Sequence, residues 1–282
     1  MTPGFQDFWA GQRELAGRPR AVETRQIPFP GAPATYYELS FPGTDGAPLR
    51  ARYIQTPAKS PAPAVLIYHD DGRAVRGWHH MTRFSALGYS VIALENRRPF
   101  WDISAGWENA PGGLAAAQLY TDAMTAAYVA RALPEIDPER LVTWGEGLGG
   151  GLAIAVAALV PGVVRCAALN PLPAGPELAW EQGYSQGLLG GILAHFRGHD
   201  PEHAQAEAFF QAMGYLDCAG FAPALRCPLL LGTGLMDKAA PPACQQLVAD
   251  RAAGPVTHLK YPKYEHERIN FFENELLKFL HF

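Results

Sequence analysis

Short apolar segments alternate with longer helical stretches through most of the chain, and this alternation constrains the fold more than any other feature. The segment at 64–68 is apolar at consecutive positions, so both of its faces are predicted to be buried. Further strands are predicted at 90–94, 141–144, 164–169, 228–232 and 256–261, and the clearest helices at 114–133, 148–159 and 267–280. The pattern predicts an α/β protein with a mostly parallel central sheet and helices on both faces.

The first 55 residues follow a different pattern. A short helix is predicted at 5–15, and two strands at 35–41 and 49–55 flank the turn residues 43–46, which indicates an N-terminal antiparallel hairpin. No repeat, low-complexity tract or linker interrupts the sequence. Residues 1–282 are therefore predicted to form a single domain.

Charge and composition exclude several functions. The 282 residues include 23 Lys and Arg against 27 Asp and Glu, for a net charge of −4, with no basic block that would bind nucleic acid or a membrane surface. The first 15 residues contain charges that a signal peptide would lack, and the longest apolar stretch, 149–160, is too short to span a bilayer. The four cysteines lack C-x-x-C spacing, which favours reduced thiols. We expect a cytoplasmic protein without nucleic-acid or membrane partners.

A glycine-rich turn connects the predicted strand at 141–144 to the helix that follows. In α/β-hydrolases this junction carries the nucleophile in a G-x-S-x-G motif, whose small residues permit a strained turn. Gly145 and Gly149 take the small positions, so the nucleophile position is Gly147 and the serine is absent. A register that makes Glu146 the nucleophile would place large side chains at the small positions, and we reject it.

Two residues occur in the order expected for the rest of a catalytic triad. Asp237 follows the strand predicted at 228–232, and His266 follows the strand predicted at 256–261. Either residue alone is more often a surface acid or a loop histidine. Their joint occurrence after successive late strands favours a triad, or at minimum its remnant.

Segments along nearly the whole chain resemble the acetyl xylan esterase and cephalosporin C deacetylase family of α/β-hydrolases. They are Phe5-Gln-Asp-Phe-Trp9, Leu49-Arg-Ala-Arg-Tyr53, Tyr120-Thr-Asp122, residues 133–141, Gly149-Gly-Gly-Leu-Ala153, Gly234-Leu-Met-Asp237 and residues 261–267. The resemblance implies the α/β-hydrolase fold and the removal of acetyl groups from small sugars or related esters by a serine assisted by His and Asp. It places the oxyanion-hole N–H groups at Asp71 and Leu148. It also implies a lid-like insertion at about 171–215 and a closed homo-oligomer.

The differences from the family gather at the predicted site. Besides Gly147 in place of serine, Asp70-Asp71 replaces a Gly-Tyr pair, the segment 95–100 replaces an Asp-x-Arg-Gly-Gln-Gly segment, and Glu265 replaces a glycine. An engineered substitution of the nucleophile would leave the neighbouring motifs intact. These differences therefore favour a natural pseudoenzyme or an enzyme with changed chemistry.

Several carboxylates are expected just past the strand ends. They are Asp70, Asp71, Glu95, Glu146, Asp237 and Glu265, and Arg73, Arg76, Arg97 and Arg98 lie near some of them in sequence. We predict that Glu95, Glu146 and Glu265 contribute to ligand binding. The preferred interpretation is internal salt bridging, and the alternative is a pocket for a cationic ligand or a hard metal ion.

Other motifs give weaker signals. Gly183-Tyr-Ser185-Gln-Gly187 spells G-x-S-x-G, but no buried strand precedes it. Histidines 195, 199 and 203 have helical spacing for zinc, but Gly198 and Pro201 interrupt a helix, so a solvated loop followed by a helix at about 201–213 is predicted. No phosphate-binding or dinucleotide-binding loop is present. We expect no metal and no cofactor.

Two functional classes remain open. The first is an impaired esterase relative or pseudoenzyme that binds a small-molecule ligand, such as an acetylated sugar or related ester, or that supports an assembly. The second is an active carboxylic-ester hydrolase that uses Asp237 and His266 with another nucleophile, such as Ser185 or an activated water.

Overall fold

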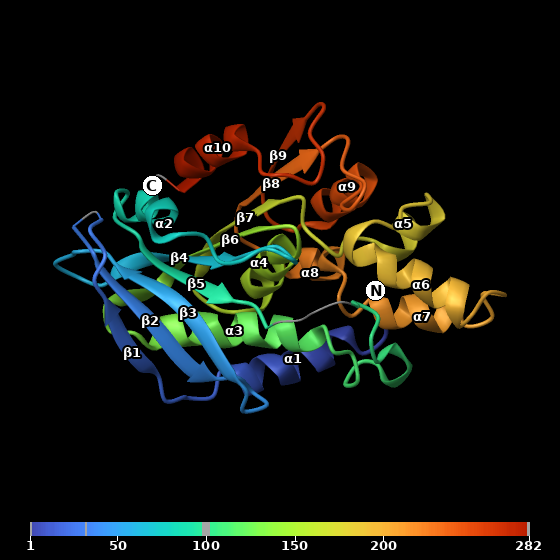
Figure 1. Ribbon diagram of the computed structural model, residues 1–282, viewed down its shortest axis with the longest axis horizontal. Helices are drawn as coiled ribbons and strands as arrows, with labels where there is room; N and C mark the ends of the chain where they lie inside the picture. Colours follow the sequence, from blue (N-terminus) through green and yellow to red (C-terminus); the bar gives the residue numbers. More distant parts are fainter. Residues whose placement is uncertain (1, 32, 98–101, 281–282) are drawn as a thin grey trace.

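A nine-stranded sheet runs through the centre of the computed structural model, which describes residues 2–31, 33–97 and 102–280 (Figure 1). The strands are β1 (Glu23–Ile27), β2 (Thr35–Pro42), β3 (Pro48–Gln55), β4 (Ala62–Tyr68), β5 (Ser90–Glu95), β6 (Ile136–Glu146), β7 (Val163–Leu169), β8 (Leu229–Gly234) and β9 (Val256–Tyr261). Their order across the sheet is β1-β2-β3-β5-β4-β6-β7-β8-β9.

The sheet changes from antiparallel to parallel along this order. Strands β1, β2 and β3 pair antiparallel with one another, and β3 pairs antiparallel with β5. The remaining neighbours, from β5 to β9, pair parallel. The predicted hairpin is therefore β2 and β3. Strand β1 was not predicted, because its five residues are polar or only partly buried and main-chain pairing with β2 defines it.

Side-chain alternation along the central strands builds two cores, one on each face of the sheet. In β4, Leu66 and Tyr68 enter one core, whereas Val65 and Ile67 enter the other. Such a strand has no solvent-facing side, which is why its sequence is continuously apolar. The predicted buried strand at 64–68 is confirmed.

Ten α-helices are found in the described part of the chain, together with three short 3-10 helices. The α-helices are α1 (Phe5–Ala16), α2 (Trp78–Ser85), α3 (Ala117–Ala132), α4 (Leu148–Leu159), α5 (Pro176–Glu181), α6 (Gly190–Gly198), α7 (Ala206–Met213), α8 (Cys218–Phe221), α9 (Pro242–Arg251) and α10 (Asn270–Leu280). The 3-10 helices are η1 (Trp107–Asn109), η2 (Gly187–Leu189) and η3 (Ala222–Ala224).

Helices cover both faces of the sheet, as predicted. Figure 1 shows α2 and α10 on one side and α1 and α3 on the other. Helix α4 packs against β6 and β7 and against α3, and its first nine residues are all buried. None of the described helices has the length and apolar character needed to cross a membrane.

The segment between β7 and α8 carries the helices α5, α6 and α7 and differs from prediction in two details. The helix expected from 201 begins only at Ala206, because His203 adopts a left-handed φ of 57° and Asp200 instead accepts hydrogen bonds from the N–H groups of Ala204 and Gln205. The expected solvated loop is also wrong at His195, which is buried in α6 with its ring 4.4 Å from that of Phe209. That residues 171–215 act as a lid stays a prediction.

Candidate active site

The turn between β6 and α4 has the strained geometry predicted for a nucleophile position. Gly147 has φ 54° and ψ −124°, a backbone conformation that residues with a side chain rarely adopt. A Cβ at Gly145 would lie 2.0 Å from the Gly149 carbonyl oxygen, and one at Gly149 would lie 2.1 Å from the Tyr68 carbonyl oxygen. The small residues are therefore required by close backbone packing, as the sequence indicated.

Asp70 occupies the space that a side chain at position 147 would need. This residue follows β4, and its side chain points toward Gly147. A Cβ built on Gly147 would lie 1.8 Å from Asp70 Oδ1 and 2.2 Å from its carboxyl carbon. Asp70 is only 5% exposed, so its carboxylate is enclosed in the space beside Gly147.

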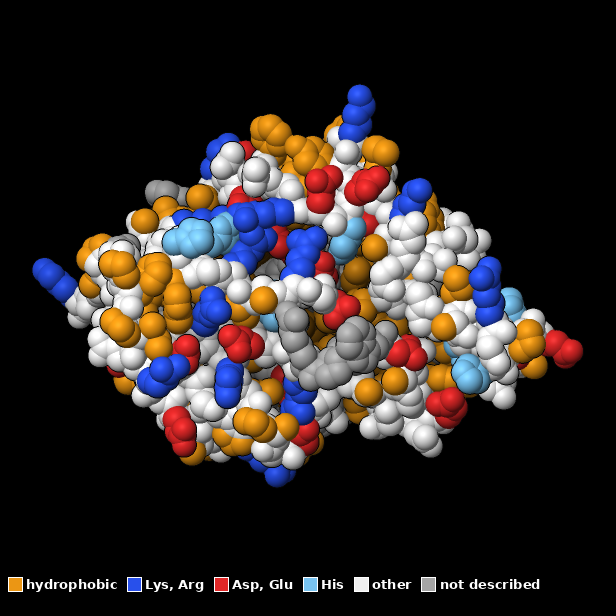
Figure 2. Space-filling model, viewed as in Figure 1, with side chains coloured by type: hydrophobic (Ala, Val, Ile, Leu, Met, Phe, Trp, Pro, Cys, Tyr) orange, Lys and Arg blue, Asp and Glu red, His pale blue; other side chains and the backbone are white. Residues whose placement is uncertain are grey.

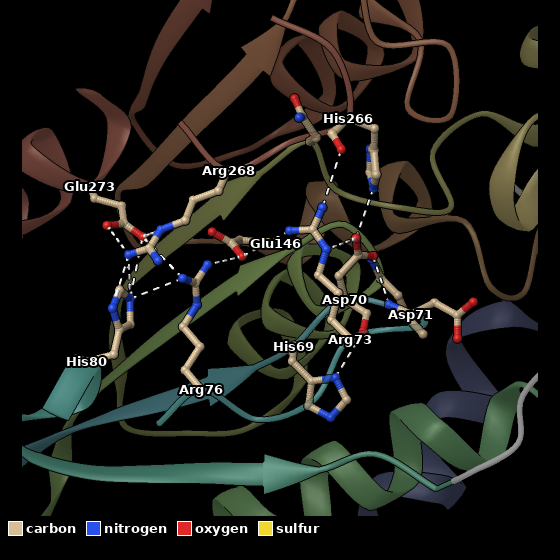
Figure 3. Close-up of polar contacts among 12 residues, drawn as sticks. His69, Asp70, Asp71, Arg73, Arg76, His80, Glu146, His266, Arg268 and Glu273 are labelled. Atoms are coloured by element: carbon tan, nitrogen blue, oxygen red, sulfur yellow. Dashed lines mark hydrogen bonds and ion pairs between the residues drawn. The ribbon is translucent and has the colours of Figure 1, made fainter. Parts of the chain in front are cut away.

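The same carboxylate accepts hydrogen bonds from both N–H groups expected to form an oxyanion hole (Figure 3). The Asp71 N–H and the Leu148 N–H each donate to Asp70 Oδ1 at 2.9 Å. The second oxygen, Oδ2, lies 3.0 Å from His266 Nε2. One aspartate side chain thus contacts the two backbone donors and the histidine together.

His266 lies between two carboxylates. Its Nδ1 is 2.7 Å from Asp237 Oδ2, and Asp237 is held in turn by the N–H groups of Ala239 and Ala240, each donating to Oδ1 at 2.8 Å. The Asp237 side chain is fully buried. The structure therefore brings the predicted Asp237 and His266 together and adds Asp70 to form an Asp–His–Asp arrangement.

Both acceptors favour the charged form of His266. Burial of the ring lowers its pKa, but the hydrogen bonds to Asp237 and Asp70 outweigh burial and raise the pKa to about 10. Burial also opposes ionisation of Asp70, but the hydrogen bonds from His266 and from the Leu148 N–H outweigh this effect and lower the Asp70 pKa. At neutral pH the pair is an imidazolium and a carboxylate.

His69 fixes the backbone that carries Asp70. Its Nε2 accepts the N–H of Asn96 at 3.0 Å, so its proton is on Nδ1, which donates to the Asp70 carbonyl oxygen at 2.9 Å. The Asn96 side-chain amide also donates to the His69 carbonyl oxygen at 3.0 Å. Asn96, the residue after β5, thereby holds the loop after β4.

The three residues predicted to bind ligand are separated in the structure. Glu146 is buried at the end of β6 and pairs with Arg76. Glu95 ends β5, where its carboxylate is 3.8 Å from Arg52, and Glu265 is exposed. The carboxylates therefore converge only in part.

The salt-bridge interpretation agrees with these pairings. Among the described residues, no group of three or more His, Cys, Asp or Glu side chains is arranged to hold a metal ion. Residues 98–100 of the replaced segment 95–100, Arg98 among them, lie outside the described part of the chain.

Ser185 lies between α5 and η2, and both ring nitrogens of His266 already contact carboxylates.

The role of Asp70 was missed by sequence reasoning, which grouped it with the other carboxylates. The available signal was a pair of changes, a glycine at the nucleophile position and an aspartate where the family has glycine.

The fold and site define an α/β-hydrolase: a mostly parallel sheet, a sharp turn after β6, and an acid and a histidine after β8 and β9. The family model of acetyl xylan esterase (AXE1) matches residues 2–282, and the chain belongs to this family.

Two solved structures resemble the chain over nearly its whole length. Acetyl xylan esterase 1 from Thermoanaerobacterium sp. JW/SL YS485 superposes with a TM-score of 0.93 at 23% identity, covering 99% of this chain and 93% of that one. The acetyl xylan esterase from Paenibacillus sp. R4 gives 0.90 at 23% identity, covering 99% and 94%. These similarities show the fold.

A curated relative matches over a shorter stretch. Acetyl esterase Axe7A from Xylanibacter ruminicola is 29% identical over 138 residues, which are 48% of this chain. The match spans 29% of the length of that relative.

Proposed function

We propose that this chain is a ligand-binding member of the acetyl xylan esterase family that does not hydrolyse esters through an acyl-serine intermediate. One observation carries the proposal. Asp70 Oδ1 accepts hydrogen bonds from the N–H groups of Asp71 and Leu148, from within the space that a side chain at position 147 would need. We propose a small molecule as the ligand, either an acetylated sugar or a related ester.

Occupation of the oxyanion hole opposes the chemistry of ester hydrolysis. The tetrahedral intermediate of acyl transfer is stabilised by donors that point at its developing negative oxygen. Here a buried carboxylate already uses those donors. A second negative charge in the same place would be repelled at short range in a partly desolvated site.

The charge state of His266 also opposes this reaction. A general base must accept a proton, and its pKa must lie near the working pH. With a pKa raised to about 10 by Asp237 and Asp70 against the effect of burial, His266 is already protonated at neutral pH. It stabilises the Asp70 carboxylate instead of activating a hydroxyl or a water.

Asp70 is itself a poor nucleophile in this arrangement. Both of its oxygens accept hydrogen bonds, and its lowered pKa marks a stabilised, weakly basic carboxylate. Attack by Asp70 on an ester would also leave the new oxyanion without the two backbone donors, because Asp70 would still be bound to them.

The second candidate, an ester hydrolase with another nucleophile, is tested by the same assay. Hydrolysis of p-nitrophenyl acetate is measured for the unaltered protein and for the His266→Ala and Ser185→Ala variants. We expect equal rates for all three, at the level of solvent hydrolysis. A rate that falls in His266→Ala contradicts the proposal, and a further loss in Ser185→Ala identifies Ser185 as the nucleophile.

The cytoplasmic location and the homo-oligomer belong to the proposal as well. The oligomeric state is measured by light scattering on the purified chain, where we expect a mass above the 30.6 kDa of one chain.

A further inference from the structure

A small cavity lies beside Asp70, at the carboxyl ends of three central strands. Its volume is about 190 Å³, which roughly six water molecules would fill, so it admits a small ligand or one part of a larger one. The strand residues in its wall are Ile67 and Tyr68 of β4, Ala93 and Leu94 of β5, and Trp144 and Glu146 of β6. Figure 2 shows basic and histidine side chains gathered around a hollow on this face.

The position of the cavity in the sheet is one where α/β proteins bind ligands. From β4 the chain continues to β5 on one side, and β6 then adds on the other side of β4. Such a reversal of strand order opens a crevice at the carboxyl ends of the strands. Asp70 also lines the cavity, so a ligand there would lie next to the Asp–His–Asp arrangement.

The arginines in the cavity wall already have partners within the protein. Arg268 makes two hydrogen bonds of 2.6 Å to Glu273, and Arg76 forms an ion pair with a glutamate of the wall. Arg73 Nη2 donates to the His266 carbonyl oxygen at 3.3 Å. A ligand therefore needs no charge of its own to compensate these side chains, which suits a neutral molecule.

Glu146 is the wall residue that lacks a partner at one of its atoms. It is 8% exposed, its Oε2 pairs with Arg76, and its Oε1 is buried with no hydrogen-bond partner among the described residues. Figure 3 shows Glu146 between Arg76 and Arg73. A buried carboxylate oxygen without a donor is unfavourable, and a ligand hydroxyl that donates to Oε1 would satisfy it.

Another part of the wall is apolar. Ile67, Val75, Ala93 and Trp144 line the cavity, and all four belong to the core on this face of the sheet or pack against it. A methyl group of a ligand would be removed from water against this surface, which is favourable. The cavity thus offers a hydrogen-bond acceptor and an apolar surface within a volume that suits a few carbon and oxygen atoms.

We propose that this cavity binds a partly acetylated sugar or smaller polyol, with a free hydroxyl donating to Glu146 Oε1 and the acetyl methyl group against the apolar wall. The proposal rests on the proposed function and narrows its ligand, because the acetylated molecule must be neutral and must keep a free hydroxyl near the acetyl group. Glu146 is then the side chain that distinguishes a partly acetylated polyol from an ester without hydroxyls.

The test uses 1-O-acetylglycerol as the probe. Propyl acetate has the same carbon skeleton without the two hydroxyls, and glycerol lacks the acetyl group. Dissociation constants are measured by ligand-observed nuclear magnetic resonance titration. We expect 1-O-acetylglycerol to bind about tenfold more tightly than either comparison compound, as one hydrogen bond to a charged group would give.

Two variants test where the probe binds. Glu146→Gln keeps the shape of the side chain and removes its charge, and should weaken 1-O-acetylglycerol about tenfold while leaving propyl acetate unchanged. Ala74→Leu enlarges an exposed residue that lines the cavity, and should weaken both esters. The control Glu139→Gln changes a glutamate that is 69% exposed and pairs with Arg131, and should alter neither affinity.

Each contrary result overturns the inference. Equal binding of propyl acetate removes the need for a hydroxyl, and equal binding of glycerol removes the need for the acetyl group. Unchanged affinity for 1-O-acetylglycerol in Ala74→Leu, or in Glu146→Gln with a melting temperature near that of the unaltered protein, places the ligand elsewhere. Absence of binding by all three compounds rejects the site.

The proposed function is decided separately in the same spectra, which would show any acetate released from 1-O-acetylglycerol. Release that is lost in His266→Ala contradicts the proposed function, whereas the effects of Glu146→Gln and Ala74→Leu on affinity still decide where the ligand binds.

Discussion

Asp70 and Gly147 act as one unit at the residue scale, because the Asp70 carboxylate fills the space that a side chain at position 147 would need. A Cβ on residue 147 would lie 1.8 Å from Asp70 Oδ1. Steric exclusion therefore adds to the strain of a positive φ at this position. The two contributions can be separated by substitution.

Gly147→Ala is expected to lower the free energy of unfolding by about 2–5 kcal/mol, through backbone strain and overpacking. Gly46→Ala is the control, since Gly46 has φ 82° with nothing within 4 Å of a Cβ, and only about 1 kcal/mol should be lost. Asp70→Gly should reduce the effect of Gly147→Ala in a double-mutant cycle. Additive effects would show that Asp70 does not occupy this space.

His266 should remain protonated well above neutral pH. Its pKa, raised to about 10 by Asp237 and Asp70 despite burial, predicts imidazolium chemical shifts at pH 8 in nuclear magnetic resonance spectra. Asp70→Asn should lower the pKa, because one of the two negative partners is removed. A neutral ring at pH 8 in the unaltered protein would contradict the charge state assigned to the site.

The same pKa fixes the sign of a stability effect. The folded pKa of about 10 exceeds the unfolded value of about 6.5. The stabilisation from His266 is thus complete below about pH 6.5 and is lost as the pH rises toward 10. The difference in unfolding free energy between the unaltered protein and His266→Ala should shrink over this range.

At the scale of elements, an ion pair ties the turn between β2 and β3 to α3. Arg97 hydrogen bonds to Asp122 in α3, including one contact of 2.8 Å, and to Asp45 in the turn at 2.6 and 2.8 Å. The Asp122 side chain is 3% exposed. Its carboxylate therefore depends on Arg97 for most of its charge compensation.

Arg97→Ala is expected to lower the free energy of unfolding by about 2–4 kcal/mol, because a buried carboxylate loses its partner. Arg140→Ala, which removes an exposed pair with Asp137, should change it by less than about 1 kcal/mol. Urea denaturation measures both. Equal effects would mean that the buried pair contributes no more than a surface pair.

The elements that sequence reasoning predicted are those whose pattern reflects burial. Strand β4 is apolar throughout because both faces are covered, and the turn at Gly147 follows from the glycines around it. Strand β1 was not predicted, because backbone pairing alone defines its polar segment. The contact of Asp70 with Leu148 was not predicted, because 78 residues separate them in sequence.

At the scale of the whole molecule, the two cores share the strands of one sheet. Strands β4, β5 and β6 contribute alternate residues to each, so loss of one core should expose the other. Sequence patterning could predict this layered architecture. It could not predict the arginine-lined cavity, whose side chains come from the ends of β4, β5 and β6, from the segment between β4 and α2, and from the loop before α10.

A single unfolding transition is therefore expected for residues 1–282. Tryptophan fluorescence and far-ultraviolet circular dichroism should give the same midpoint in guanidinium chloride. Trp180, in α5, reports on the predicted insertion at 171–215, which packs on one core, and Trp144 reports on the other core. An earlier transition that disappears in Trp180→Phe would show that the insertion unfolds separately and would contradict the prediction of one domain.

The most direct test of the central claim is the hydrolysis of p-nitrophenyl acetate by restored variants. Gly147→Ser alone should stay inactive, since its side chain collides with Asp70 and the backbone donors remain occupied. The double variant Asp70→Gly with Gly147→Ser should gain activity that is lost on adding His266→Ala. Turnover by the unaltered protein that depends on His266, or by Gly147→Ser alone, would contradict the assignment of Asp70 as the group that closes this site.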